Sequence, residues 1–332
     1  MRRWRLGRKL LLGVAVLVAV VGVSSYARYR PELDRARARI AAGSRIAASR
    51  CGRIEYAEAG EGPPVLIVHG AGGGFDQGMD LGAGLAGAGF RVIAPSRFGY
   101  LGTPLPADAS AEAQADAHAC LLDALGVDGA AIMGISAGGP SATQFALRFP
   151  ARTRALVLLV PALYAPRPNQ APPVRASRTT IFLFDTALRS DFLFWAGSKL
   201  APRAFTRGIL GTPPELVDQA PPAEQARVHG VLDHILPVSA RRVGLLNDAR
   251  VVSSLPRYDL ERIAAPTLAI STADDGYGTF DGAQYTAAHV PHARFVGYPS
   301  GGHMLVGRDA AAAAEIVAFL RSAPGALSLY MQ

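Results

Sequence analysis

Residues 130–139 constrain the fold of this chain more than any other segment, because an apolar strand there leads through a glycine-framed serine into a helix. Residues 134–138 fit the pattern G-x-S-x-G. In a tight strand-to-helix turn, Gly134 and Gly138 leave room for a strained backbone, and Ser136 is held out at the carboxyl end of the strand. The helix behind the serine favours negative charge beside it. The pattern alone is weak, and an ordinary Gly/Ser turn is the alternative, but the strand before it and the helix after it make it specific.

Short apolar runs alternate with helical stretches along most of the chain, which predicts an α/β fold with a mostly parallel sheet flanked by helices. The expected strands are 53–58, 65–69, 91–95, 130–135, 155–160, 267–271 and 294–298. The expected helices are 76–88, 110–125, 138–148 and 309–321.

One long interval, from Ala165 to about Tyr258, breaks this alternation with prolines, aromatic residues and short helical pieces. An insertion of this length between two core strands predicts a helical cap over the sheet edge. The expected divisions of the chain are 1–27 as a signal peptide or signal anchor, 28–50 as a basic stalk or linker, 51–166 as the first part of the core, 167–258 as the cap, 259–323 as the second part of the core, and 324–332 as a tail.

The N-terminus has the layout of a membrane-targeting segment: basic residues, then an apolar run from Leu10 to Val23, then small residues up to Ala27. The run approaches the roughly 20 residues that a spanning helix needs. We expect a membrane-anchored or exported protein, and favour an uncleaved anchor with the body on the outer face. Because arginines lie on both sides of the run, their charges do not settle its orientation.

The net charge of +8 is confined to the N-terminal part of the chain. Residues 1–50 contain twelve Arg and Lys residues against Glu32 and Asp34, which leaves about −2 for the rest. The folded body therefore offers no basic face, and no nucleic-acid partner is expected.

Two further segments carry the acid and the base that a serine nucleophile requires, in the chain order serine, acid, histidine. Asp274 and Asp275 follow the expected strand 267–271, and His303 follows the last strand. Since parallel strands end at one sheet edge, His303 is expected to take the proton of Ser136, and a carboxylate to orient the imidazole.

With these motifs, and with His69-Gly70 after the first parallel strand, residues 52–323 resemble the α/β-hydrolase superfamily, especially its cap-bearing esterase, lipase and C–C hydrolase branch. The resemblance implies the triad Ser136, Asp275 and His303, with Asp274 as the alternative acid. It also implies an oxyanion hole formed by backbone N–H groups: Ala137 provides one, and Ala71, or alternatively Gly72, provides the other. No cofactor is implied.

The resemblance implies hydrolysis of a carboxylic ester of a small, largely apolar substrate through an acyl-enzyme. A C–C hydrolase of ring-cleavage products is an alternative, although such enzymes commonly have Asn before the nucleophile and Trp after the histidine, where this chain has Ile135 and Met304. A cofactor-free perhydrolase or haloperoxidase and a non-catalytic binding module are further alternatives. The oligomeric state is left open.

Other signals carry less weight. Residues 70–74 lack the spacing of a dinucleotide-binding glycine loop. His229 and His234 lack a third metal ligand, so no metal is expected, and His118 is expected at the surface. A small buried side chain is the preferred interpretation of Cys120, and a disulfide with Cys51 is left open.

Overall fold

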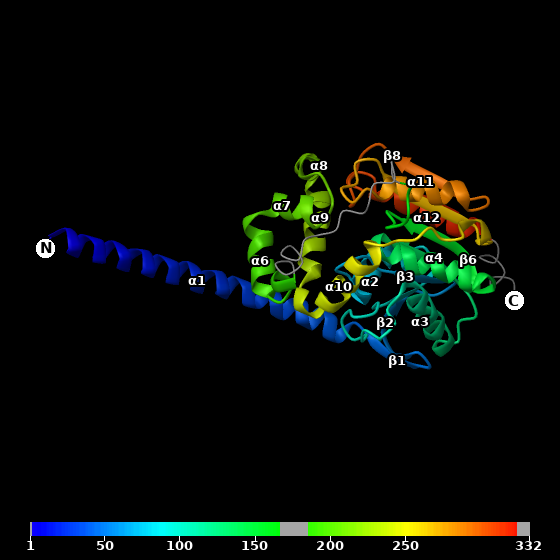
Figure 1. The fold of residues 1–332 in the computed structure, drawn as a ribbon, viewed down its shortest axis with the longest axis horizontal. Coiled ribbons are helices and arrows are strands. Elements are labelled where there is room, and N and C mark those ends of the chain that lie inside the picture. Colours follow the sequence, from blue (N-terminus) through cyan, green and yellow to red (C-terminus); the bar gives the residue numbers. More distant parts are fainter. Residues whose placement is uncertain (1, 167–184, 324–332) are drawn as a thin grey trace.

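The computed structural model describes residues 2–166 and 185–323, and it shows an α/β body from which one long helix projects (Figure 1). The strands are β1 (Arg45–Ser49), β2 (Gly52–Ala59), β3 (Pro64–Val68), β4 (Arg91–Pro95), β5 (Ala130–Ile135), β6 (Thr153–Leu159), β7 (Thr267–Thr272) and β8 (Arg294–Tyr298). The α-helices are α1 (Arg2–Ala42), α2 (Phe75–Gly87), α3 (Ala111–Ala124), α4 (Gly139–Arg148), α6 (Asp191–Leu200), α7 (Pro202–Gly208), α8 (Pro214–Gln219), α9 (Pro222–Ile235), α10 (Arg242–Val252), α11 (Thr279–His289) and α12 (Asp309–Ser322).

Within the described residues the sheet has eight strands in the order β1-β2-β4-β3-β5-β6-β7-β8. The strands from β4 to β8 run parallel, and β2 joins β4 in the antiparallel sense. The predicted α/β-hydrolase arrangement, with a mostly parallel sheet, is confirmed. All parallel strands therefore end at the same edge, to which the loops after β3, β5, β7 and β8 belong.

Helices cover both faces of the sheet because side chains alternate along each strand. On one face Leu66 and Ile132 pack with Phe145 beneath α3, α4 and α11. On the other face Ile67 and Met133 pack beneath α2 and α12. Burial on both faces explains why these strands are continuous apolar runs in the sequence.

The expected cap lies between β6 and β7, where α6 to α9 form a helical group beside the body and α10 lies against the core next to α2 (Figure 1). Ser190 begins α6 by accepting a hydrogen bond from the N–H of Leu193 at 3.2 Å. Part of the expected cap, residues 167–184, and the expected tail, residues 324–332, lie outside the described residues.

The structure places residues 28–50 differently from the expected stalk in two respects. Residues 28–42 continue α1 and pack on the cap, with Tyr29, Leu33 and Ala36 buried among cap side chains. Residues 45–49 form β1, which pairs antiparallel with β2, so the core begins before residue 51. The spacing of Tyr29, Leu33 and Ala36 gives α1 one apolar stripe between its arginines.

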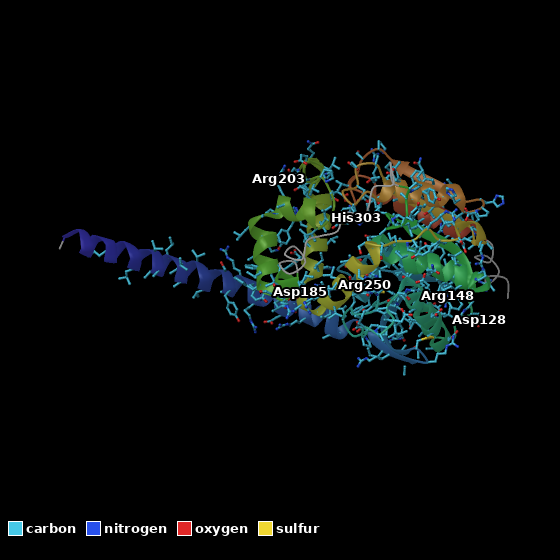
Figure 2. All side chains as sticks on the ribbon, viewed as in Figure 1. Asp128, Arg148, Asp185, Arg203, Arg250 and His303 are labelled. Atoms are coloured by element: carbon cyan, nitrogen blue, oxygen red, sulfur yellow. A yellow bond between two sulfur atoms is a disulfide. The ribbon has the colours of Figure 1, made fainter. Side chains whose placement is uncertain are left out.

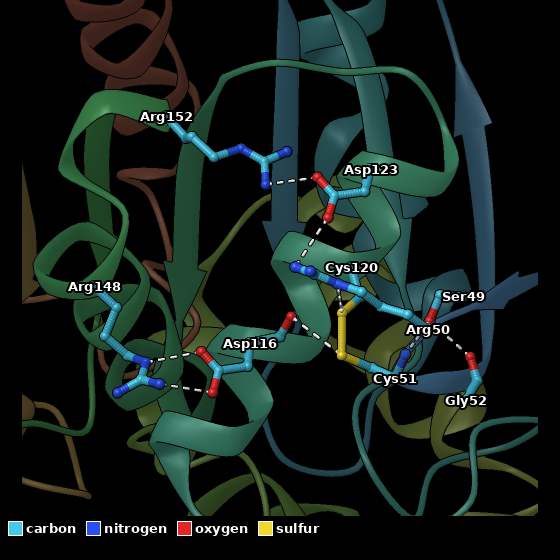
Figure 3. Close-up of a disulfide and its surroundings, with 9 residues drawn as sticks. All are labelled: Ser49, Arg50, Cys51, Gly52, Asp116, Cys120, Asp123, Arg148 and Arg152. Carbon is cyan, nitrogen blue, oxygen red and sulfur yellow. Dashed lines mark hydrogen bonds and ion pairs between the residues drawn. A yellow bond between two sulfur atoms is a disulfide. The ribbon is translucent and has the colours of Figure 1, made fainter.

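Cys51 and Cys120 form a disulfide that joins the turn between β1 and β2 to α3 (Figure 3). Cys120 is buried, as expected, but its sulfur is paired. Ion pairs surround the bridge: Asp116 binds Arg148 at 2.7 Å, and Asp123 binds Arg152 at 2.8 Å (Figure 3). The disulfide therefore fastens the edge strands of the sheet to the helical layer.

Candidate active site

Ser136 lies in a strained turn between β5 and the helical segment that continues as α4. Its φ of 49° is in the left-handed region, which is unfavourable for a residue with a Cβ. The two flanking glycines are required by space. A Cβ on Gly138 would lie 2.3 Å from the carbonyl oxygen of Val68, and one on Gly134 would lie 2.5 Å from the Cβ of Ala142. The sequence pattern thus has a steric basis in close packing of the turn against β3 and α4.

Ser136 is partly exposed, although β5 before it is buried throughout. The N–H of Ala137 lies in the first turn of the helical segment, where backbone N–H groups have no intrahelical acceptor. Within the described residues the Ser136 hydroxyl makes no hydrogen bond, and the contact of His303 at this edge is with Asp275. Catalytic hydrogen bonds are often long before substrate binds.

His303 and Asp275 are in contact at the same sheet edge. Nδ1 of His303 lies 2.8 Å from Oδ2 of Asp275, and both side chains are buried. Because a carboxylate only accepts hydrogen bonds, Nδ1 is the donor in this contact, and in the neutral ring this tautomer leaves the lone pair on Nε2. His303 lies where the cap meets the core (Figure 2).

Asp275 is itself fixed by other donors. The N–H of Tyr277 donates to its Oδ1 at 2.8 Å, and the Thr279 hydroxyl donates to its Oδ2 in a short hydrogen bond. The Ser271 hydroxyl lies 2.9 Å from that of Thr279 and extends the chain of contacts into β7. These contacts hold the carboxylate in one orientation toward the imidazole.

Asp274 has a different environment. Its Oδ1 accepts hydrogen bonds from the N–H groups of Gly301 and Gly302 at 3.0 and 2.8 Å. Gly302 adopts a φ of 60°, a conformation for which glycine is suited, directly before His303. Asp274 therefore shapes the loop that carries the histidine, whereas Asp275 contacts the ring.

The glycine-rich loop after β3 passes directly behind the serine, since a Cβ on Gly70 would lie 3.1 Å from that of Ser136. The N–H of Gly72 donates to the Tyr100 hydroxyl at 3.2 Å. Within the described residues the N–H of Ala71 has no hydrogen-bond partner. Of the two amides considered for this side of the oxyanion hole, the structure thus leaves that of Ala71 available.

A buried polar network, which the sequence did not indicate, holds the glycine-rich loop after β3 in place. Arg97 forms two hydrogen bonds of 2.6 Å with Asp248 and one of 3.1 Å with the carbonyl of Gly70. The Tyr100 hydroxyl donates to Asp248 at 2.6 Å. Asp248 belongs to α10, so the network ties the loop to the cap.

His69 takes part in the same network as a neutral ring. Its Nε2 accepts from the N–H of Arg97 at 3.0 Å, and its Nδ1 donates to the carbonyl of Gly70 at 2.7 Å. Burial, reinforced by the Arg97 charge, holds the pKa of His69 well below its usual value. His69 is a loop-shaping residue.

A second buried cation, Arg241, secures the far end of the loop. It binds Asp76 through two hydrogen bonds of 3.0 and 2.6 Å and donates to the carbonyl of Gly73 at 2.6 Å. Burial alone would raise the pKa of Asp76, but its contacts with Arg241 hold that pKa below its usual value. Arg39 of α1 reaches the same carboxylate at 3.4 Å.

The cap also contacts the histidine loop directly. The carbonyl of Gly211 accepts from the N–H groups of Gly276 and His303 at 2.8 and 3.2 Å. The ring of Tyr277 packs edge-on against the His303 ring at 4.9 Å, and its hydroxyl donates to the carbonyl of Ile209 at 2.8 Å. The cap therefore forms part of the walls around the imidazole.

Similarity to known proteins agrees with this architecture. Residues 63–309 match the family described as alpha/beta hydrolase fold. A 2-hydroxy-6-oxo-6-phenylhexa-2,4-dienoate hydrolase of Burkholderia cepacia is 30% identical over 184 residues, which are 48% of this chain and 64% of the relative. A 2-hydroxymuconate semialdehyde hydrolase of Pseudomonas putida is 40% identical over 110 residues, which are 32% of this chain and 39% of the relative.

These matches cover less than two thirds of each relative's length. Among solved structures, an alpha/beta hydrolase fold protein from Nakamurella multipartita is 26% identical with a TM-score of 0.67, covering 84% of this chain and 99% of that one. Together with the strained serine turn and the acid–histidine pair, the family match over most of the chain establishes that this protein belongs to the alpha/beta hydrolase fold family.

Proposed function

We propose that this hydrolase cleaves a carboxylic ester with Ser136 as its nucleophile. The contact between His303 and Asp275, on the sheet edge that carries the strained Ser136 turn, is the observation that carries the proposal. A base with a free lone pair and a fixed tautomer is what activation of an alcohol requires.

In the proposed reaction, Nε2 of His303 takes the proton of Ser136 as its oxygen attacks the ester carbonyl. The N–H groups of Ala71 and Ala137 then stabilise the oxyanion, and each such donor contributes about 3 kcal/mol in the transition state. His303 returns the proton to the leaving alcohol, and water hydrolyses the acyl-enzyme by the same steps.

An apolar acyl group is supported by an apolar cap side chain that contacts the oxyanion loop. Ile235, at the end of α9, reaches over Gly72, where an added Cβ would lie 3.4 Å from its Cγ1. It belongs to the apolar cluster of the cap. Apolar side chains line most sites for small molecules.

Hydrolysis of a C–C bond is the second candidate, supported by the names of the Burkholderia and Pseudomonas relatives. The two can be separated by supplying a short p-nitrophenyl ester and the phenylhexadienoate named for the first relative. Our proposal expects turnover of the ester, its loss in Ser136→Ala and its retention in the exposed-serine control Ser253→Ala. Cleavage of the dienoate alone would refute ester hydrolysis.

We further propose that α1 anchors the protein in a membrane with the body on the oxidising side. Leu12–Ala42 is long and apolar enough to span by length and composition, a property that signal sequences share. The Cys51–Cys120 disulfide favours the outer face, since cytosolic thiols are kept reduced. Protease added to intact cells from which any outer layer has been stripped should digest the body; complete protection would contradict this orientation.

A further inference from the structure

The projecting part of α1 exposes apolar side chains on every side. Exposed valines and leucines run from Leu12 to Val23, with no helix of the described body against them (Figure 1). By contrast, the stripe of Tyr29, Leu33 and Ala36 is buried against the cap. Within a few residues, α1 therefore changes from a helix that is apolar and exposed on all sides to a helix that packs as part of the cap.

The contact between α1 and the cap fixes the two together. The ring of Tyr29 packs 5.3 Å from that of Phe192 and 5.6 Å from that of Trp195, both on α6. Glu32 accepts a hydrogen bond from Trp195 Nε1 at 2.9 Å and pairs with Lys199 at 3.3 Å. These contacts fix the position of α6 relative to α1, so anchoring of α1 also positions α6.

Among the described residues, the outer face of α6 is apolar and uncovered. Leu193 and Leu200, seven residues apart and so on one side of the helix, are 56% and 85% exposed, whereas Phe194 and Ser198 on the opposite side are buried. The exposed surface continues into the start of α7. We call it the α6–α7 patch, and its members are Leu193, Leu200, Ala201, Pro202 and Ala204.

Helices α6 and α7, which carry the α6–α7 patch, lie on the side of the body from which α1 projects (Figure 1). Basic residues accompany it: Arg28 is exposed on α1 just before Tyr29. On α7, Arg203 (Figure 2) and Arg207 are exposed and pair with Glu215. Arginines beside an apolar membrane segment are typical of a membrane–water interface.

We propose that the α6–α7 patch rests on the lipid bilayer that α1 enters, so that the cap is a membrane-contact surface. This inference rests on the proposed membrane location of α1 and is independent of the ester chemistry. A patch of this size is too small to bind a membrane alone. Anchoring of α1 in the bilayer already holds the cap close to the lipid surface, so even a weak contact is enough to set the orientation of the body.

The two native cysteines are joined, so one introduced cysteine can carry a single label without reductant. The full chain is labelled with an environment-sensitive fluorophore at Leu200→Cys, at Ile46→Cys as an exposed control, and at Val20→Cys to report insertion of α1. Ile46 lies on β1 beyond Ala42, and Tyr29 and Ala42 are about 20 Å apart along the helix axis at 1.5 Å per residue.

Each labelled protein is placed in vesicles of phosphatidylcholine and phosphatidylglycerol containing a spin-labelled lipid that quenches fluorescence on contact. We expect blue-shifted, strongly quenched emission at positions 20 and 200 and an unquenched signal at 46. Quenching at 20 without quenching at 200 would overturn the inference, and a blue shift at 200 without quenching would assign the patch to a second copy of the chain instead. Quenching at neither position would refute the membrane location itself.

Discussion

Replacing Tyr100 with phenylalanine removes one buried hydroxyl and leaves the rest of the ring in place, which tests how the oxyanion loop is held. The hydroxyl accepts from the N–H of Gly72 at 3.2 Å and donates to Asp248 at 2.6 Å. Burial and the charge of Asp248 raise the pKa of Tyr100 well above its usual range, so this donor stays protonated at any working pH. The ring contacts with His69 and Arg97 persist in the variant.

The cost follows from the two broken hydrogen bonds. An unsatisfied buried N–H costs about 1–3 kcal/mol, and a lost hydrogen bond to a charged group costs about 1.5–3 kcal/mol. We expect Tyr100→Phe to lower the free energy of unfolding by about 3 kcal/mol, which for a body of this size lowers Tm by roughly 6–12 °C. The freed Gly72 lets the adjacent Ala71 move, so kcat for an ester should fall about tenfold while KM changes little.

Urea and thermal unfolding of Tyr100→Phe are compared with those of Tyr298→Phe, a half-buried tyrosine whose hydroxyl has no hydrogen bond in the described part of the chain. If both variants stay within about 0.5 kcal/mol of the parent protein, as surface changes do, the hydroxyl does not anchor the loop and our reasoning fails.

Three further predictions concern the acid, the buried histidine and the disulfide. Asp275→Asn should lower kcat by roughly 10⁴-fold because the imidazole loses its fixed tautomer, whereas Asp274→Asn keeps an acceptor for the histidine loop and should lose far less; equal losses would contradict the assignment. Burial and the Arg97 charge lower the pKa of His118 from 6.5 to about 3, so between these pH values the residue binds a proton only on unfolding, and stability falls by about 1.4 kcal/mol per pH unit from pH 6.5 toward pH 3. Urea unfolding at pH 7 and pH 5 should show that the free energy of unfolding falls less between these pH values in His118→Gln than in the parent protein. The double substitution Cys51→Ser and Cys120→Ala removes a disulfide between residues 69 positions apart and should lower the free energy of unfolding by about 4 kcal/mol. Ester turnover should be retained, because neither cysteine lies in the serine, glycine or histidine loops.

The strands near the serine could be predicted because they are buried on both faces of the sheet and therefore appear in the sequence as uninterrupted apolar runs. This sequence signal is lost where an element is only partly buried or buries mainly small residues. The edge strand β1 exposes most of its side chains and carries no such run. Helix α11 buries mainly Thr279, Gly282, Ala283 and Thr286, which are too small and polar to mark a helical face.

The candidate site shows the same division between local and distant information. The positions of Ser136, Asp275 and His303 at one sheet edge could be predicted because each lies within five residues of the end of its strand. The pair of Arg97 and Asp248 lies 151 positions apart, and nothing near either residue indicates the other. His118, expected at the surface, is buried against Ser141 instead. The sequence did not indicate this burial because many of its neighbours on α3 are alanines, which do not mark a buried helical face.

The central claim, that Ser136 is an activated nucleophile, is tested most directly by covalent labelling. The intact protein is treated with a fluorophosphonate, and the modified peptide is identified by mass spectrometry. We predict one adduct on Ser136, none on Ser136→Ala, and much slower formation on His303→Ala, because the probe reacts with serines that a base has activated. An adduct on Ser136→Ala at the parent rate, or an unlabelled protein that still cleaves esters, would contradict the account.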